Sequence, residues 1–273
     1  MRRNRHFPER MVAMKNIGFI GMGNMARAIV RGVLAGGAAE AGNLSAYAPH
    51  YDRLRAFADE TGICACRSIG ELLERSDTVV MAVKPYVVEG VLAEIRESLK
   101  GKAMLSVVAG YTLERYRPLV DPSVRVQYVM PNTPCMVGEG VLLFESANTL
   151  SPEEHAAAVK LFQSLGEVVE LETHLMDAAT AISGCGPAFV AMMMEALADA
   201  GVKYGLPRAT AYRLAAQMAL GTGKMQLETG MIPAEIKDGV CSPRGTTIRG
   251  VEALEASGMR HAFMEAVKAT IER

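Results

Sequence analysis

The sequence predicts an α/β protein with a parallel sheet in its N-terminal part and an all-helical C-terminal part. In residues 14–173, short apolar runs alternate with segments of helical spacing, as expected of strands joined by crossover helices. After residue 173 the strand patterns stop, and long Ala- and Met-rich helical patterns follow. Because 273 residues exceed the usual length of one domain, we expect two, at 14–173 and 174–273.

Composition limits the possible classes of protein. Half of the residues are hydrophobic and the net charge is −1, which argues against a nucleic-acid-binding surface. Five cysteines, an odd number in a long chain, favour a reducing and cytoplasmic location over a disulfide framework. Cys64 and Cys66 have no further ligand nearby, so no metal site is predicted. No unbroken apolar run reaches the roughly 18–20 residues of a membrane span, so we expect no membrane contact.

Residues 1–13 precede the first strand pattern and carry four arginines. They lack the apolar segment of a secretory signal. We expect a flexible N-terminal extension rather than an arm that binds nucleic acid.

The expected strands are short, and one of them is an unbroken apolar run that ends at Lys84 and Pro85, as a buried parallel strand would. The predicted strands span residues 16–20, 44–48, 63–65, 78–83, 103–108, 124–130, 141–144 and 167–170, with a helix at 52–61. In parallel sheets, ligands bind outside the carboxyl ends of the strands. The segments that follow these strands are therefore candidates for function.

The first expected strand runs into a glycine turn and a helix start, in the order G-x-G-x-x-A. Gly21 permits the tight turn, Gly23 lets the backbone approach a pyrophosphate, and the small Ala26 lets the helix pack closely on the strand. The free N–H groups at Asn24 and Met25 would face the phosphates. This pattern predicts a Rossmann-type dinucleotide-binding domain.

The second expected strand lacks the acidic residue that usually binds the ribose of NAD. It ends at Ala48 and Pro49, and the next acid is Asp52. The absence favours NADPH over NADH, with His50, Tyr51 and Arg53 as candidate partners of the 2′-phosphate.

The C-terminal helices carry few charges. We expect them at residues 176–204, with an interruption at 184–187, and at 207–228, 233–237, 246–256 and 259–272. Faces this apolar are typical of subunit interfaces, so we expect an obligate dimer.

Five motifs, in order, resemble the pyrroline-5-carboxylate reductase family: GFIGMGNMA, AVKP, MPNTP, SGCGPAF and SPRGTT. The segment GVKYGLP is also similar to the link between two long helices of that family. The resemblance implies a two-domain oxidoreductase that reduces 1-pyrroline-5-carboxylate to L-proline with NAD(P)H, the last step of proline biosynthesis. It further implies a homodimer or a ring of dimers.

The resemblance also implies which residues contact the cofactor and the substrate. The implied cofactor-binding residues are Ile20, Gly21, Met22, Gly23, Asn24, Met25, Ala48, Pro49, Ala82, Val83, Lys84, Pro85, Val107, Val108 and Ala109. Asn132 would lie near the nicotinamide carboxamide, and the implied substrate residues are Asn132, Val240, Ser242, Gly245, Thr246 and Thr247.

Reduction of an imine is helped when its nitrogen is protonated or hydrogen-bonded. No His or carboxylate is conspicuous in the substrate loop, and Thr247 is our candidate for a catalytic hydroxyl. The alternative is that Thr246 and Thr247 only start a helix. We interpret Lys84 as a residue that ends a strand, because hydride transfer to an imine needs no Schiff base.

Three positions depart from the family pattern. Arg244 stands where the family has glycine, and it is either strained by a positive φ or placed as a cation near the substrate carboxylate. The family usually has an asparagine near the adenosine end of the cofactor, where this chain has Ser68 and Ile69. Cys185 stands where the family usually has a serine. We assign Cys185 no role.

Three other functions fit part of the pattern. A β-hydroxyacid dehydrogenase would use a lysine on the inter-domain helix, and residues 183–195 contain none. Another imine reductase remains an alternative. A non-enzymatic NADP-sensing module would leave the Gly-Thr-Thr segment without a purpose.

Overall fold

The computed structural model describes residues 14–272. The expected N-terminal extension therefore lies outside the described residues. By their contacts, the described residues form two compact units, one ending at Gly184 and one beginning at Cys185.

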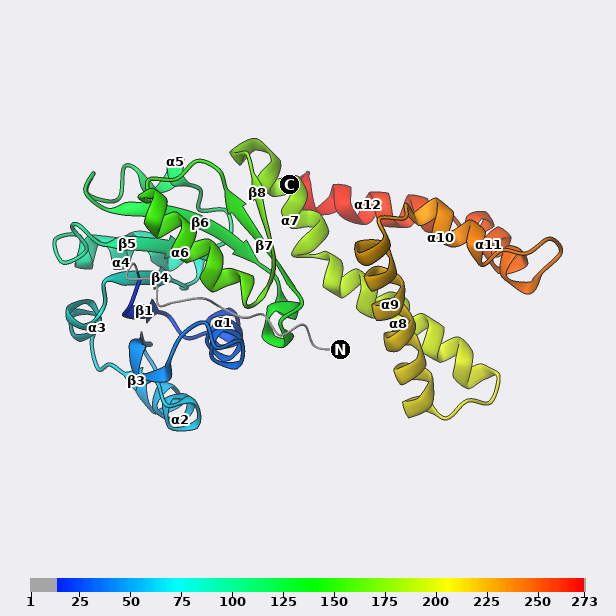
Figure 1. Cartoon of the computed structure of the whole chain (residues 1–273), viewed down its shortest axis with the longest axis horizontal. Helices are drawn as coiled ribbons and strands as arrows, with labels where there is room; N and C mark the ends of the chain where they lie inside the picture. The colour runs from blue at the N-terminus through cyan, green and yellow to red at the C-terminus, as the bar shows by residue number, and fades with distance from the viewer. Residues whose placement is uncertain (1–13, 273) are drawn as a thin grey trace. The chain divides into compact units, whose positions relative to one another are not determined.

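The first unit is built on one eight-stranded sheet (Figure 1). Its strands are β1 (Ile17–Ile20), β2 (Leu44–Tyr47), β3 (Cys64–Ala65), β4 (Thr78–Met81), β5 (Ala103–Ser106), β6 (Arg125–Pro131), β7 (Gly140–Glu145) and β8 (Gly166–Leu171). Their order in the sheet is β3-β2-β1-β4-β5-β6-β7-β8. The order reverses direction beside β1, as in a doubly wound fold, and this confirms the predicted class.

The expectation that the whole sheet is parallel is wrong at one edge. β6 pairs with β7 in the antiparallel direction, and β8 is parallel to β7. Only a short segment that contains the 3₁₀ helix η3 (Thr133–Val137) joins β6 to β7. A parallel pair needs a crossover of roughly a dozen residues or more, so this connection can only turn the chain back.

Helices cover both faces of the sheet, and alternate strand residues point to opposite faces. The side chains of Phe19 and Val80 lie on one face of the sheet. This face is covered by α1 (Asn24–Ala35), α2 (Tyr51–Thr61) and α6 (Pro152–Gln163). Ile20 and Met81 pack against the other face, which is covered by α3 (Ile69–Arg75), α4 (Val88–Ile95) and α5 (Leu113–Tyr116). Three short elements, η1 (Ala41–Asn43), η2 (Pro85–Val87) and η4 (Thr173–Leu175), lie in connections, and α7 (Met176–Ser183) packs on β7.

The second unit is helical. It consists of α8 (Gly186–Lys203), α9 (Arg208–Thr229), α10 (Pro233–Gly239), α11 (Thr246–Ala256) and α12 (Met259–Ile271). α8 packs on α9, and α11 packs on α12 (Figure 1). The expected break falls between α7 and α8, and the helix ends agree with the predicted ranges to within about two residues.

The helical unit buries little of its own apolar surface. Among residues 185–272, the buried side chains are those of Ala198, Ala211 and Ala215. Its large exposed apolar residues include Met192, Leu197, Tyr204, Leu214, Met218, Leu220, Leu227 and Met264. A monomeric protein rarely leaves so much apolar surface in water, so this unit needs a partner surface.

One helical stretch departs from the expectation that no segment is suited to a membrane. Thr173–Lys203 is long and apolar enough to span one by length and composition alone, and 11% of its most apolar window is buried in the single chain. Polar and small residues interrupt its apolar runs, so no single run is long. Because the stretch carries few charged residues, its mean hydropathy is nevertheless high.

Candidate cofactor and substrate sites

The carboxyl ends of the six parallel strands, β1 to β6, lie at one edge of the sheet. Backbone hydrogen bonds join the segments that leave them: Gly21 N–H donates to Tyr47 O at 2.9 Å, Ala82 N–H to Ile20 O at 2.9 Å, and Val107 N–H to Met81 O at 3.0 Å. All predicted cofactor residues, and Asn132 after β6, follow or end these strands. The first unit therefore brings them to the same edge.

The two glycines of the β1–α1 turn differ in what surrounds them. Gly21 has φ +96°, and a Cβ there would lie 2.7 Å from Ala82 O. Both conformation and space require glycine. Gly23 has φ −78°, and a Cβ there would meet nothing within 4 Å. Nothing in the described chain requires Gly23 to lack a side chain, so the open space beside it fits a bound group.

Helix α1 presents a free N-terminus to this space. Its N-cap is Gly23, no side chain caps it, and its first turn carries no acid. The first N–H groups of a helix have no partner within the helix, and its dipole favours negative charge there. Ala26, the third residue of the turn pattern, is buried at 1% exposure and packs on the sheet. The end of α1 is thus suited to a phosphate group.

The end of β2 carries no carboxylate. Ala48 is half-buried, Pro49 and His50 are exposed, and Asp52 is the acid in the first turn of α2. Ser68, which stands near the family's asparagine, caps α3: its Oγ accepts from Glu71 N–H at 3.1 Å. Local helix capping therefore accounts for Ser68.

The segments after β4 and β5 differ in exposure. Ala82 and Val83 are half-buried, Lys84 and Pro85 are exposed, and Lys84 O accepts the Val87 N–H at 2.9 Å. Val107 and Val108 are buried, whereas Ala109 is exposed. Lys84 lies beyond the end of β4 at Met81 and directly before η2, and its interpretation as a residue without a catalytic role stays a prediction.

Asn132 has a structural role that sequence reasoning missed. Its Oδ1 accepts from Val141 N–H at 2.9 Å, and its Nδ2 donates to Ser183 O at 2.9 Å. The side chain thereby joins the end of β6 to β7 and to the end of α7. One Nδ2 hydrogen remains for a ligand.

Cys135 lies close to the same turn but is not a nucleophile. Its thiol is buried, and burial raises its pKa to about 11. It stays protonated near neutral pH and packs 3.9 Å from Met25 Sδ.

The predicted substrate residues after Asn132 lie in the second unit, in the loop before α11. Gly245 is the N-cap, and its N–H donates to Ser242 O at 2.9 Å. A Cβ on Gly245 would lie 3.0 Å from the same oxygen. Val240, Ser242, Thr246 and Thr247 are exposed in the single chain.

Arg244 adopts φ 59°, the left-handed conformation. The strain considered from sequence is therefore present, because a Cβ in this conformation contacts the backbone closely. Thr246 and Thr247 do start α11, but no side chain caps this helix. Their predicted place at a helix start is confirmed, the cap position itself is Gly245, and both threonines are exposed.

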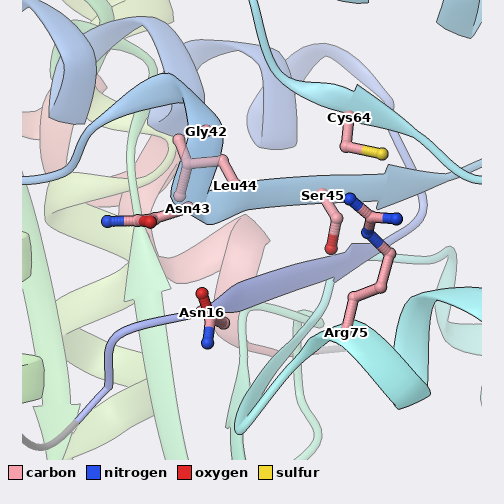
Figure 2. Close-up of a pocket in the computed structure, with 7 residues that line it drawn as sticks. All are labelled: Asn16, Gly42, Asn43, Leu44, Ser45, Cys64 and Arg75. Carbon is pink, nitrogen blue, oxygen red and sulfur yellow. The ribbon is translucent and has the colours of Figure 1, made fainter.

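A separate cavity of about 260 Å³ lies at the amino ends of β1, β2 and β3, at the edge opposite to the glycine turn. Its lining residues are Asn16, Gly42, Asn43, Leu44, Ser45, Cys64 and Arg75. Figure 2 shows Arg75 reaching toward Ser45 and Cys64, whereas Asn43 points away from them. No predicted site residue lines it.

Both parts of the chain match known protein families. Residues 173–273 match the family described as pyrroline-5-carboxylate reductase dimerisation. Residues 16–110 match the family described as NADP oxidoreductase, coenzyme F420-dependent.

Curated relatives match nearly the whole chain. Pyrroline-5-carboxylate reductase of Treponema pallidum is 43% identical over 260 residues, which cover 94% of this chain and 98% of the relative. That of Escherichia coli is 40% identical, with 95% and 97% covered. A solved structure of Plasmodium falciparum pyrroline carboxylate reductase with NADP bound superposes with a TM-score of 0.86 at 33% identity, covering 94% of this chain and 95% of that one. Identity at this level over the full length shows that this chain belongs to the pyrroline-5-carboxylate reductase family.

Proposed function

We propose that this protein reduces 1-pyrroline-5-carboxylate to L-proline with NADPH, as the last step of proline biosynthesis. The observation that carries the proposal is 43% identity to a pyrroline-5-carboxylate reductase over 94% of the chain. The open space at Gly23 and the loop before α11 supply a candidate place for each reactant.

The proposed cofactor residues are those predicted from sequence. The N–H groups of Asn24 and Met25 would hold the pyrophosphate, and Ala48 and Pro49 would flank the adenosine ribose. The segments 82–85 and 107–109 would line the nicotinamide side. The fit rests on the open space at Gly23 and on the uncapped end of α1.

In the proposed reaction the ring C=N bond becomes a C–N single bond. NADPH, when bound, supplies a hydride to the ring carbon and leaves as NADP⁺, and the nitrogen gains or already holds one proton. The exposed Thr247 hydroxyl would hydrogen-bond the nitrogen as its charge changes. The uncapped N–H groups at the start of α11 would bind the substrate carboxylate.

The helical region corresponds to the family's dimerisation region and leaves large apolar side chains exposed. We propose that each active site combines the sheet unit of one subunit with the 242–247 loop of its partner. We further propose that dimers assemble into a ring and that the enzyme is cytoplasmic.

NADPH is proposed as the preferred cofactor over NADH. The support is the missing carboxylate at Ala48, since an acid there would repel a 2′-phosphate.

The direct test is the oxidation of NADPH by the purified protein with pyrroline-5-carboxylate, followed by its absorbance and by detection of proline. Turnover would support the proposal over a β-hydroxyacid dehydrogenase and a sensing module. Turnover of a β-hydroxyacid, or nucleotide binding by folded protein with no imine reduction, would refute it.

A further inference from the structure

The carboxyl ends of β2 and β3 bring two distant loops together at the proposed adenosine end of the site. The strands pair in parallel, with Ala46 opposite Ala65, and Cys66 N–H donates to Ala46 O at 2.8 Å. The residues just beyond them, Tyr51 at the start of α2 and Arg67 before α3, are therefore neighbours. The Arg67 guanidinium carbon lies 4.5 Å from the centre of the Tyr51 ring.

Three arginines of helices α1 and α2 are committed to partners. Arg31 pairs with Glu60 at 2.9 Å and Arg55 with Asp59 at 2.8 Å. Arg27 donates to two backbone carbonyls, those of Met22 at 3.2 Å and Arg53 at 3.3 Å.

Arg67 differs from these arginines. Within residues 14–272 its guanidinium forms no ion pair and no side-chain hydrogen bond, and one of its faces lies over the Tyr51 ring. Its backbone N–H donates to Glu71 Oε2 at 2.8 Å, so Glu71 fixes the loop without neutralising the side chain. A guanidinium stacked on a ring keeps its N–H fork free and preorganised for a planar or tetrahedral oxyanion.

We infer that Arg67 is the residue that binds the 2′-phosphate of NADPH, with Tyr51 as its positioning residue. This inference rests on the proposed function for the nucleotide but not on the identity of the imine substrate. Sequence reasoning pointed to His50, Tyr51 and Arg53, which are close in the chain to Ala48. Arg67 follows the next strand, β3, and lies near Tyr51 only in the folded sheet.

The test compares binding of 2′,5′-ADP, which carries the 2′-phosphate, with 5′-AMP, which lacks it, by isothermal titration calorimetry. Arg67→Gln should weaken 2′,5′-ADP by about ten- to a hundredfold and leave 5′-AMP within twofold, since a charge-assisted contact is lost. Tyr51→Ala should show part of this loss and Tyr51→Phe little of it. Arg75→Gln, a change at the far end of α3, is the matched control and should bind both nucleotides normally.

Three outcomes would overturn the inference. The first is that Arg67→Gln binds 2′,5′-ADP with wild-type affinity. The second is that Arg67→Gln loses affinity for 2′,5′-ADP and 5′-AMP equally. The third is that Arg53→Gln alone loses affinity selectively for 2′,5′-ADP. The binding measurement uses no pyrroline-5-carboxylate. Selective loss in Arg67→Gln therefore supports the inference even if imine turnover, and with it the proposed reaction, fails.

Discussion

Thr247 is the residue on which the proposed chemistry most depends. Its hydroxyl is exposed at the start of α11 and does not cap the helix. We expect Thr247→Val to lower kcat by about ten- to a hundredfold, because a hydrogen bond that strengthens as charge develops is worth roughly 1.5–3 kcal/mol. Steady-state kinetics with saturating NADPH would measure this loss, while NADPH affinity should stay unchanged.

Thr246→Val is the matched control for that variant. The same atoms change one residue earlier in α11, and neither side chain caps the helix. Both variants should therefore melt at nearly the same temperature, and Thr246→Val should lose less turnover than Thr247→Val. A Thr247→Val enzyme within twofold of wild-type kcat would remove this residue from the mechanism.

Arg244 is strained by its own backbone. At φ 59° a Cβ costs about 1 kcal/mol relative to glycine, so Arg244→Gly should raise the free energy of unfolding by about that amount. Arg244→Ala removes the same charge but keeps the Cβ, and it should give no such gain. Urea unfolding of both variants separates strain from charge, and equal stability of the two would contradict the strain argument.

Ala48 is the residue on which the proposed preference for NADPH over NADH rests. Ala48→Asp adds a carboxylate at the end of β2, where it would repel a 2′-phosphate and bind ribose hydroxyls. We expect the ratio of kcat/KM for NADPH over NADH to fall at least tenfold. Ala48→Asn, which is similar in size but uncharged, should shift the ratio less. A wild-type enzyme that already prefers NADH would contradict the premise.

At the scale of elements, the two glycines of the β1–α1 turn should affect different properties, Gly21 the stability of the protein and Gly23 its affinity for NADPH. Gly21→Ala should destabilise the protein by more than about 1 kcal/mol, because φ is +96° and the methyl would lie 2.7 Å from Ala82 O. Gly23→Ala should leave stability nearly unchanged, since that space is open and φ is −78°. It should weaken NADPH at least tenfold, because the methyl would occupy the approach of the pyrophosphate.

Thermal unfolding without cofactor and NADPH titration by fluorescence would measure the two effects. Normal NADPH affinity in Gly23→Ala would show that the nucleotide does not approach this turn.

At the scale of the whole molecule, the exposed apolar surface of the helical unit predicts that the dimer is obligate. Leu220, on α9, is 56% exposed in the single chain. If a partner covers it, Leu220→Glu should shift the mass measured by light scattering from dimer toward monomer, because a buried unpaired charge is costly. Leu220→Met should remain dimeric. A charge variant that stays dimeric and active would place Leu220 outside the interface.

The sequence by itself determined the elements and the family. The alternation of strand and helix patterns, the glycine turn at residues 21–26 and the break before α8 are local features, because periodicity and turn chemistry act over a few residues. The expected strand and helix ranges therefore lie close to those observed. The five ordered motifs led to the family that the relatives confirm.

Only the tertiary structure decided which distant residues meet. Strand patterns carry no direction, so the antiparallel β6–β7 pair followed from the short connection and not from the strands themselves. Asn132 reaches Ser183, 51 residues away, and Arg67 reaches Tyr51 across two paired strands. These contacts depend on pairing and packing between segments that are far apart in the chain, which no local pattern encodes.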